Sequence, residues 1–233
     1  MLKKKLQNKF IKFTKKQFKN LKLNTMKTKI LSTLMILFLS ASLALAQTTE
    51  TAKMSFAVIG GINFQNLNGK TPAGVKLEND MLMGYHLGVN VQIPIAPEFY
   101  FQPGLLYAVK GAKNTYVLGT EFKNTKINYI EMPLNLVYKA LLGNGYFMLG
   151  FGPYLAYGIG GKSTTEGGIE QDIDYKKFDA GANMFAGYEM PGGIFLQMDT
   201  QFGMLNINPE NSDSNDKSKT NNTGFGLSVG YRF

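Results

Sequence analysis

From Met54 to the C-terminus, large apolar side chains alternate with small or polar ones at a period of two residues. This period is typical of a β-strand that has one apolar and one polar face. In the last stretch the apolar positions are Phe225, Leu227, Val229, Tyr231 and Phe233. Eight stretches show the alternation, and each predicts a strand, over residues 54–64, 81–93, 99–110, 130–139, 147–159, 178–190, 194–204 and 224–233.

The segment 140–161 is the strongest competitor for a transmembrane helix, because it has no charged residue over 22 positions. It also contains seven glycines and Pro153. Each interior glycine costs a helix about 1 kcal/mol and a proline about 3 kcal/mol. The segment is therefore a poor helix, and its alternation favours a strand.

The connections between the predicted strands are alternately long and short. Long connections of about 15 to 17 residues span 65–80, 111–125, 162–177 and 206–222. Short turns lie between them, at 96–98, 141–144 and 191–192. Outer-membrane barrels have long external loops and short periplasmic turns, whereas a β-sandwich has no reason for this rhythm. The pattern predicts an all-β fold, an eight-stranded antiparallel up-and-down transmembrane β-barrel.

Charged residues occur only on the polar faces of these strands. On the lipid face, a central lysine or arginine costs about 2 to 4 kcal/mol. The interior of an eight-stranded barrel is just wide enough for its own side chains. We therefore expect a polar network in the lumen, formed by His86, Glu131, Lys139, Asp179, Glu189, Asp199 and Arg232.

The aromatic residues and the prolines of the strands lead to two further expectations. Aromatic residues near the strand ends are expected to form girdles at the two membrane interfaces. Prolines, which cannot donate to a β-ladder, are expected at strand ends or bulges. This expectation applies to Pro94, Pro103, Pro133 and Pro153.

The net charge of +9 comes from the N-terminal end of the chain. Residues 1–46 hold 11 of the 25 basic residues and no acidic one, which leaves 14 basic against 16 acidic residues from Gln47 onward. A nucleic-acid partner, which requires basic residues on the folded domain, is therefore excluded. The absence of cysteine excludes disulfides, thiolate metal sites and a lipid-modified cysteine.

Residues 26–46 have the organisation of a helical signal peptide. A charged start is followed by an apolar stretch and by Ala44-Leu45-Ala46, which predicts cleavage before Gln47. The alternative is an uncleaved helical anchor, which needs about 20 apolar residues. Residues 1–25 are either a basic leader or an over-long gene prediction upstream of Met26. A short linker, 47–53, then precedes the barrel domain, 54–233.

Three motifs resemble the outer-membrane β-barrel domain of small porin-like proteins, and the resemblance extends from Met54 to Phe233. They lie at 101–111 (Phe-Gln-Pro-Gly-Leu-Leu-Tyr, then Lys-Gly), 129–134 and 150–154. The terminal Tyr231 and Phe233 resemble the signal by which barrels are recognised by the outer-membrane assembly machinery. The resemblance implies export past periplasmic chaperones, contact with outer-membrane lipid in a Gram-negative bacterium, and no cofactor.

Three classes of function compete. The first is a barrel with a side-chain-filled lumen, acting as a monomer in a structural or surface-interaction role through four external loops whose ligand the sequence does not name. The polar stretch 206–222 is expected to be solvated and mobile. Asp213 and Asp216 there could suggest calcium, but ordinary solvation explains them better. The second class is a narrow or gated channel for small solutes.

The third class is a lipid-modifying enzyme with serine, histidine and an acid at the external rim. The chain has one histidine, His86, at an inward position, and a single histidine is more often a hydrogen-bonded interior residue than a base. No G-x-S-x-G motif, paired-acid motif or metal-spaced histidine cluster accompanies it. The sequence therefore predicts no catalytic, cofactor or metal site.

Overall fold

The computed structural model describes residues 53–71, 74–117, 120–209 and 218–233. The leader, the signal peptide, its cleavage site at Ala46 and Gln47, and nearly all of the 47–53 linker lie outside the described residues. In the described part of the chain, no helix has both the length and the apolar character needed to cross a membrane.

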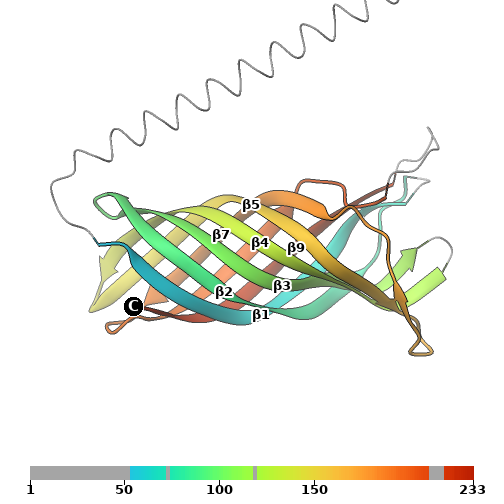
Figure 1. Ribbon diagram of the computed structural model, residues 1–233, viewed down its shortest axis with the longest axis horizontal. Helices are drawn as coiled ribbons and strands as arrows, with labels where there is room; N and C mark the ends of the chain where they lie inside the picture. The colour runs from blue at the N-terminus through green and yellow to red at the C-terminus, as the bar shows by residue number, and fades with distance from the viewer. Residues whose placement is uncertain (1–52, 72–73, 118–119, 210–217) are drawn as a thin grey trace, which may run out of the picture. The chain divides into compact units, whose positions relative to one another are not determined.

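The described residues form antiparallel strands that close into a ring (Figure 1). The ring strands are β1 (Ser55–Lys70), β2 (Asp80–Ala96), β3 (Phe99–Val117), β4 (Thr120–Leu142), β5 (Gly145–Thr164), β7 (Phe178–Glu189), β8 (Ile194–Gly203) and β9 (Lys219–Arg232). Each pairs with the next along the chain, and β1 pairs with β9 from Ala57↔Arg232 to Lys70↔Lys219. The prediction of an eight-stranded up-and-down barrel is confirmed.

A ninth, short strand lies outside the ring. β6 (Glu170–Asp172) pairs only with the end of β5, where Lys162 is opposite Asp172. All three residues of β6 are exposed and polar. No alternation in the sequence could reveal this strand, because a strand with no buried face has no apolar positions.

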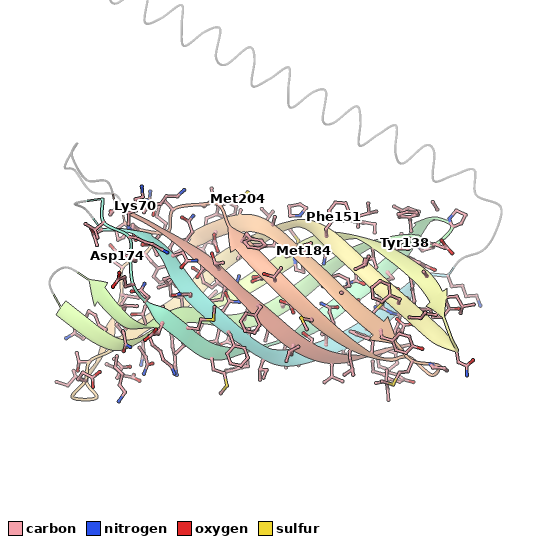
Figure 2. All side chains as sticks on the ribbon, turned by 180° about the vertical axis from the view of Figure 1, so that it is seen from behind. Lys70, Tyr138, Phe151, Asp174, Met184 and Met204 are labelled. Carbon is pink, nitrogen blue, oxygen red and sulfur yellow. The ribbon has the colours of Figure 1, made fainter. Side chains whose placement is uncertain are left out.

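The apolar face of the barrel points outward and the polar face points inward. Leu87 and Phe151 are 64% and 61% exposed, whereas Glu131 is 1% exposed. Figure 2 shows the side chains of Phe151 and Met184, which are partners in the β5–β7 ladder, directed away from the wall. This arrangement is the reverse of a soluble protein, and it suits a wall surrounded by hydrocarbon.

Aromatic pairs lie at both ends of the outward apolar band. Toward the loops, Phe64 stacks on Phe225 with ring centroids 5.1 Å apart. Toward the turns, Phe99 and Tyr138 approach to 5.2 Å, and Figure 2 places Tyr138 at the end opposite Lys70. The expected aromatic girdles therefore correspond to contacts between neighbouring strands, which fix the height of the band on the barrel.

The strands continue past the apolar band, so the long connections are shorter than predicted. β3 and β4 pair as far as Val117↔Thr120, and most of the loop expected at 111–125 is a hairpin. Inside its base, Thr125 hydroxyl contacts Thr115 hydroxyl at 2.6 Å and Ser163 hydroxyl at 2.7 Å. The prediction failed here because backbone pairing persists in water without the alternation that lipid imposes.

The proline prediction holds at one position of four. Pro94 lies beside a register shift in the β2–β3 ladder. The other three prolines lie within strands, without such a shift beside them. The β3–β4 pairing is interrupted between Pro103 and Leu106. The β4–β5 pairing is interrupted between Pro133 and Leu136. Both ladders resume in the same register after the interruption. The missing donors are therefore accommodated by local gaps rather than by bulges.

We expect the β5–β6 pairing to weaken at acidic pH. Glu170 accepts a hydrogen bond from Lys162 Nζ at 2.8 Å, and this bond lowers the pKa of Glu170 and raises the pKa of Lys162. The stabilisation is complete above the ordinary glutamate pKa and is lost as pH falls through the lower, folded pKa. Amide exchange at residues 162–164 and 170–172 between pH 7 and 3 measures it. If Glu170→Gln lost as much protection between pH 7 and 3 as the unmodified protein, the Glu170–Lys162 bond would not be the cause.

Candidate functional site

Near the turns, the lumen contains a charged triad. Glu189 on β7 accepts from Lys139 on β4 at 2.6 Å through Oε1 and from Arg232 on β9 at 2.9 Å through Oε2. All three side chains are at most 10% exposed. The lysine ammonium also lies 4.8 Å from the ring centre of Tyr146, and Arg232 lies 5.3 Å from that of Phe195. Three strands from different parts of the ring are thus joined across the lumen.

An apolar layer surrounds this triad and fills the turn-side end of the lumen. It is formed by inward apolar side chains, most of which the alternation did not single out. Its buried members are Ala57, Ile59, Val137, Met148, Phe185 and Phe195, with Tyr100 and Leu106 packed against them. Gly150 and Gly230 lie beneath the rings of Phe185 and Phe195, where a Cβ atom would come within 2.2 Å of an aromatic carbon. Small residues on one strand therefore make room for large ones on the next.

A second ion pair lies nearer the middle of the lumen. Lys110 Nζ on β3 is 2.5 Å from Glu131 Oε2 on β4, and both side chains are 1% exposed. Gln201 on β8 donates to the other oxygen of Glu131 at 2.5 Å. The ammonium also lies 4.5 Å from the ring centre of Tyr154. The pair is therefore compensated from several sides, as a buried charge requires.

Two aspartates in the lumen are held by neutral groups instead of cations. Asp179 Oδ2 accepts from Asn222 at 2.9 Å and from Tyr154 hydroxyl at 3.2 Å. Asp199 lies 3.5 Å from Ser228 hydroxyl, which in turn lies 2.8 Å from His86 Nε2. Among the described residues, neither aspartate forms an ion pair.

A cavity of about 50 Å³ lies between these groups. Most of its lining residues are polar, and three of their buried amide oxygens have no protein hydrogen-bond partner: Asn63 Oδ1, Gln65 Oε1 and Asn183 Oδ1. One water needs about 10 to 15 Å³ of such space and two to four polar partners. The cavity therefore has room for a few waters, which would satisfy these oxygens, and for no larger solute.

A second apolar layer closes the lumen at the loop side. It contains Ile207 from the β8–β9 connection, with Ile173 and Tyr175 from the β6–β7 connection packed against Tyr129 and Tyr154. Backbone hydrogen bonds hold Ile207 in place. Its amide donates to Thr220 carbonyl at 2.9 Å, and its carbonyl accepts from Lys176 amide at 2.8 Å. Part of the stretch 206–222 is thus anchored in the barrel mouth, which corrects the expectation that it is solvated. In the sequence, the only sign of this anchoring was Ile207, an apolar residue in a polar segment.

The structure places every sequence-predicted lumen residue inside the barrel but divides the set into separate groups. Lys139, Glu189 and Arg232 are brought together, and His86 reaches Asp199 through Ser228. Glu131 and Asp179 each have other partners. The predicted network did not include those partners, which are chiefly Lys110, Tyr154, Gln201 and Asn222.

The two residues of the predicted C-terminal assembly signal lie outside the lumen. Tyr231 and Phe233 point outward, with ring centroids 4.9 Å apart, and the Phe233 amide donates to Phe56 carbonyl at 2.8 Å. Within the described ranges, no group of three or more histidine, aspartate and glutamate side chains is placed to hold a metal ion.

The comparison with protein families identifies the chain. Residues 45–208 match the model for the outer membrane protein beta-barrel domain. The chain belongs to this family. The matched segment ends before β9, so the strand that closes the ring against β1 lies beyond it. Membership places the barrel in the outer membrane of a Gram-negative bacterium, in contact with lipid.

Several outer-membrane proteins of known structure are similar to the chain in fold. They include the attachment invasion locus protein Ail of Yersinia pestis in complex with the heparin analogue sucrose octasulfate (12% identity, 78% of this chain and 99% of that one, TM-score 0.41). OprG of Pseudomonas aeruginosa (13%, 77% and 95%, 0.47) and Neisserial surface protein A (14%, 76% and 95%, 0.43) are similar too. No curated protein sequence matches the chain.

Replacing Glu189 should destabilise the barrel strongly. Glu189→Ala leaves Lys139 and Arg232 facing each other without a counter-charge, and breaking a buried pair in this way costs about 3 to 5 kcal/mol. The free energy of unfolding in urea, measured in detergent micelles, reports the loss. Glu170→Ala removes an exposed pair and is the matched control, expected to change little. Equal effects of the two substitutions would show that the triad contributes nothing special.

Proposed function

We propose that this protein is a closed outer-membrane barrel that acts through its external loops in a structural or surface-interaction role. One observation carries the proposal: apolar layers occupy both ends of the lumen, and the cavity between them is about 50 Å³. A diffusing solute would have to displace side chains at both layers. The surface left for interaction is the outside of the barrel and its loops.

A narrow or gated channel is the second candidate. The middle of the lumen favours it, because the cavity is polar and is lined by Lys110, Glu131 and Asp199. Opening would require both the loop-side layer with Ile207 and the turn-side layer with Phe185 and Phe195 to move. The loop-side layer is the easier of the two to move, since connections rather than ring strands supply Ile207, Ile173 and Tyr175.

We propose no enzymatic activity. His86, the histidine whose partners are Ser228 and Asp199, is 9% exposed and lies inside the lumen. Lipid on the outer face of the barrel has no contact with it. The order of the contacts also differs from a catalytic triad, because serine rather than histidine is the central member.

The route to the membrane follows from the sequence signals. We propose that the signal peptide 26–46 is removed after Ala44-Leu45-Ala46, and that periplasmic chaperones deliver the chain to the barrel assembly machinery. The exposed Tyr231 and Phe233 at the end of β9 suit recognition by that machinery before the ring closes. A monomer is supported by the closed ring, which leaves none of its strands with an unpaired edge in lipid.

Planar-bilayer recording tests the closed lumen. We expect the purified barrel to give no stable current steps, because both apolar layers exclude ions. A variant that shortens both layers, Phe185→Ala with Phe195→Ala and Ile207→Ala, should give frequent openings.

Met184→Ala with Phe202→Ala and Leu227→Ala is the control for that variant, since these side chains face lipid and are exposed. It should stay closed. Stable, reproducible current steps from the unmodified barrel would reject the closed lumen and favour the channel.

A further inference from the structure

A groove opens on the loop side between the segments that lead into β7 and out of β8. Backbone hydrogen bonds join these segments at both ends of the groove. Met204 amide donates to Ala180 carbonyl at 2.9 Å, and Lys176 amide donates to Ile207 carbonyl at 2.8 Å. Between these bonds the segments part, and the hollow is about 740 Å³. Its lining includes Asp174, Lys176, Lys177, Phe178, Leu205 and Asn206.

Two apolar side chains of the groove lining, Phe178 and Leu205, lie at the upper limit of the lipid-facing band. Phe178 is 52% exposed and Leu205 is 38% exposed. Phe178 is the ladder partner of Tyr157 on β5, another outward aromatic residue that is 54% exposed. Aromatic side chains of this kind mark the membrane interface of barrels. The groove therefore begins where acyl chains end and head groups start.

The lining of the groove also includes two lysines. Lys176 and Lys177 directly precede Phe178, and the single carboxylate among the described lining residues is Asp174, which Figure 2 places at the loop end of the barrel. The backbone there is fixed, because Lys177 carbonyl accepts from Gly158 amide at 2.7 Å. Asn206 is occupied by bonds to Ser218 carbonyl and Thr220 amide, and so shapes the groove. Local charge thus favours an anion.

We propose that this groove binds the phosphorylated head group of an outer-leaflet glycolipid, with an acyl chain against Phe178 and Leu205. The proposal rests on the external role proposed above and names a ligand for it. Lysine ammonium groups are suited to phosphate as point charges. Along the membrane normal, the phosphates of a glycolipid lie at the level of the lysines and its acyl chains lie at the level of Phe178 and Leu205. A free anion would contact only the lysines.

Binding of lipid A, a bisphosphorylated disaccharide glycolipid, tests the proposal. The folded protein is purified from membranes and delipidated in detergent. Lipid A is then titrated into it, and the bound lipid is measured by native mass spectrometry. Lys176→Ser with Lys177→Ser should weaken binding about 25-fold, from about fivefold for each lysine near an anionic head group. Lys113→Ser with Lys123→Ser removes the same charge from β3 and β4, which do not border the groove, and should leave binding unchanged.

Three results would overturn the proposal. They are equal losses in the two double variants, equal binding of lipid A from which the phosphates have been removed, and competition by inorganic phosphate at the same concentration as lipid A. The first would show a general charge effect, the second an apolar contact alone, and the third a site for free phosphate. Because no current is measured, failure here leaves the closed lumen to be decided by the bilayer recordings.

Discussion

The pairing of every backbone polar group within the membrane is the constraint on which the barrel depends. In hydrocarbon, an unpaired amide or carbonyl costs several kcal/mol, so a sheet must have no open edge. The β1–β9 ladder removes the last edge, and Phe233 extends it by bonding to Phe56. The wall tolerates gaps beside Pro103 and Pro133 because the register on either side of each gap is unchanged.

Closure with eight strands in turn determines what the lumen can contain. Its width allows side chains from opposite walls to meet, and the meeting residues are charged or aromatic. Glu189 joins strands β4 and β9, and Glu131 joins β3 and β8. Both glutamates are paired with cations within the lumen, since an unpaired buried charge is expensive. The network thus ties together strands that share no ladder.

The two ends of the barrel differ because the chain crosses them differently. At the turns, short connections leave the charged triad and the ring's own apolar side chains to fill the lumen. At the loops, longer connections return into the mouth and supply Ile207, Ile173 and Tyr175. The same connections shape the external groove with Lys177 and Phe178. Closure of the lumen and the external surface are therefore built from shared segments.

The alternation from Met54 to Phe233 determined by itself the number of ring strands, their antiparallel order and the positions that face lipid, because lipid imposes one rule on every outward position. It also placed Glu131, Lys139 and Arg232 inward. Only the tertiary structure decided that Lys139 meets Glu189, that Asp179 meets Tyr154, and that Ile207 enters the mouth. Strand tilt and register bring these residues together across the lumen, and no local pattern in the chain encodes those distances.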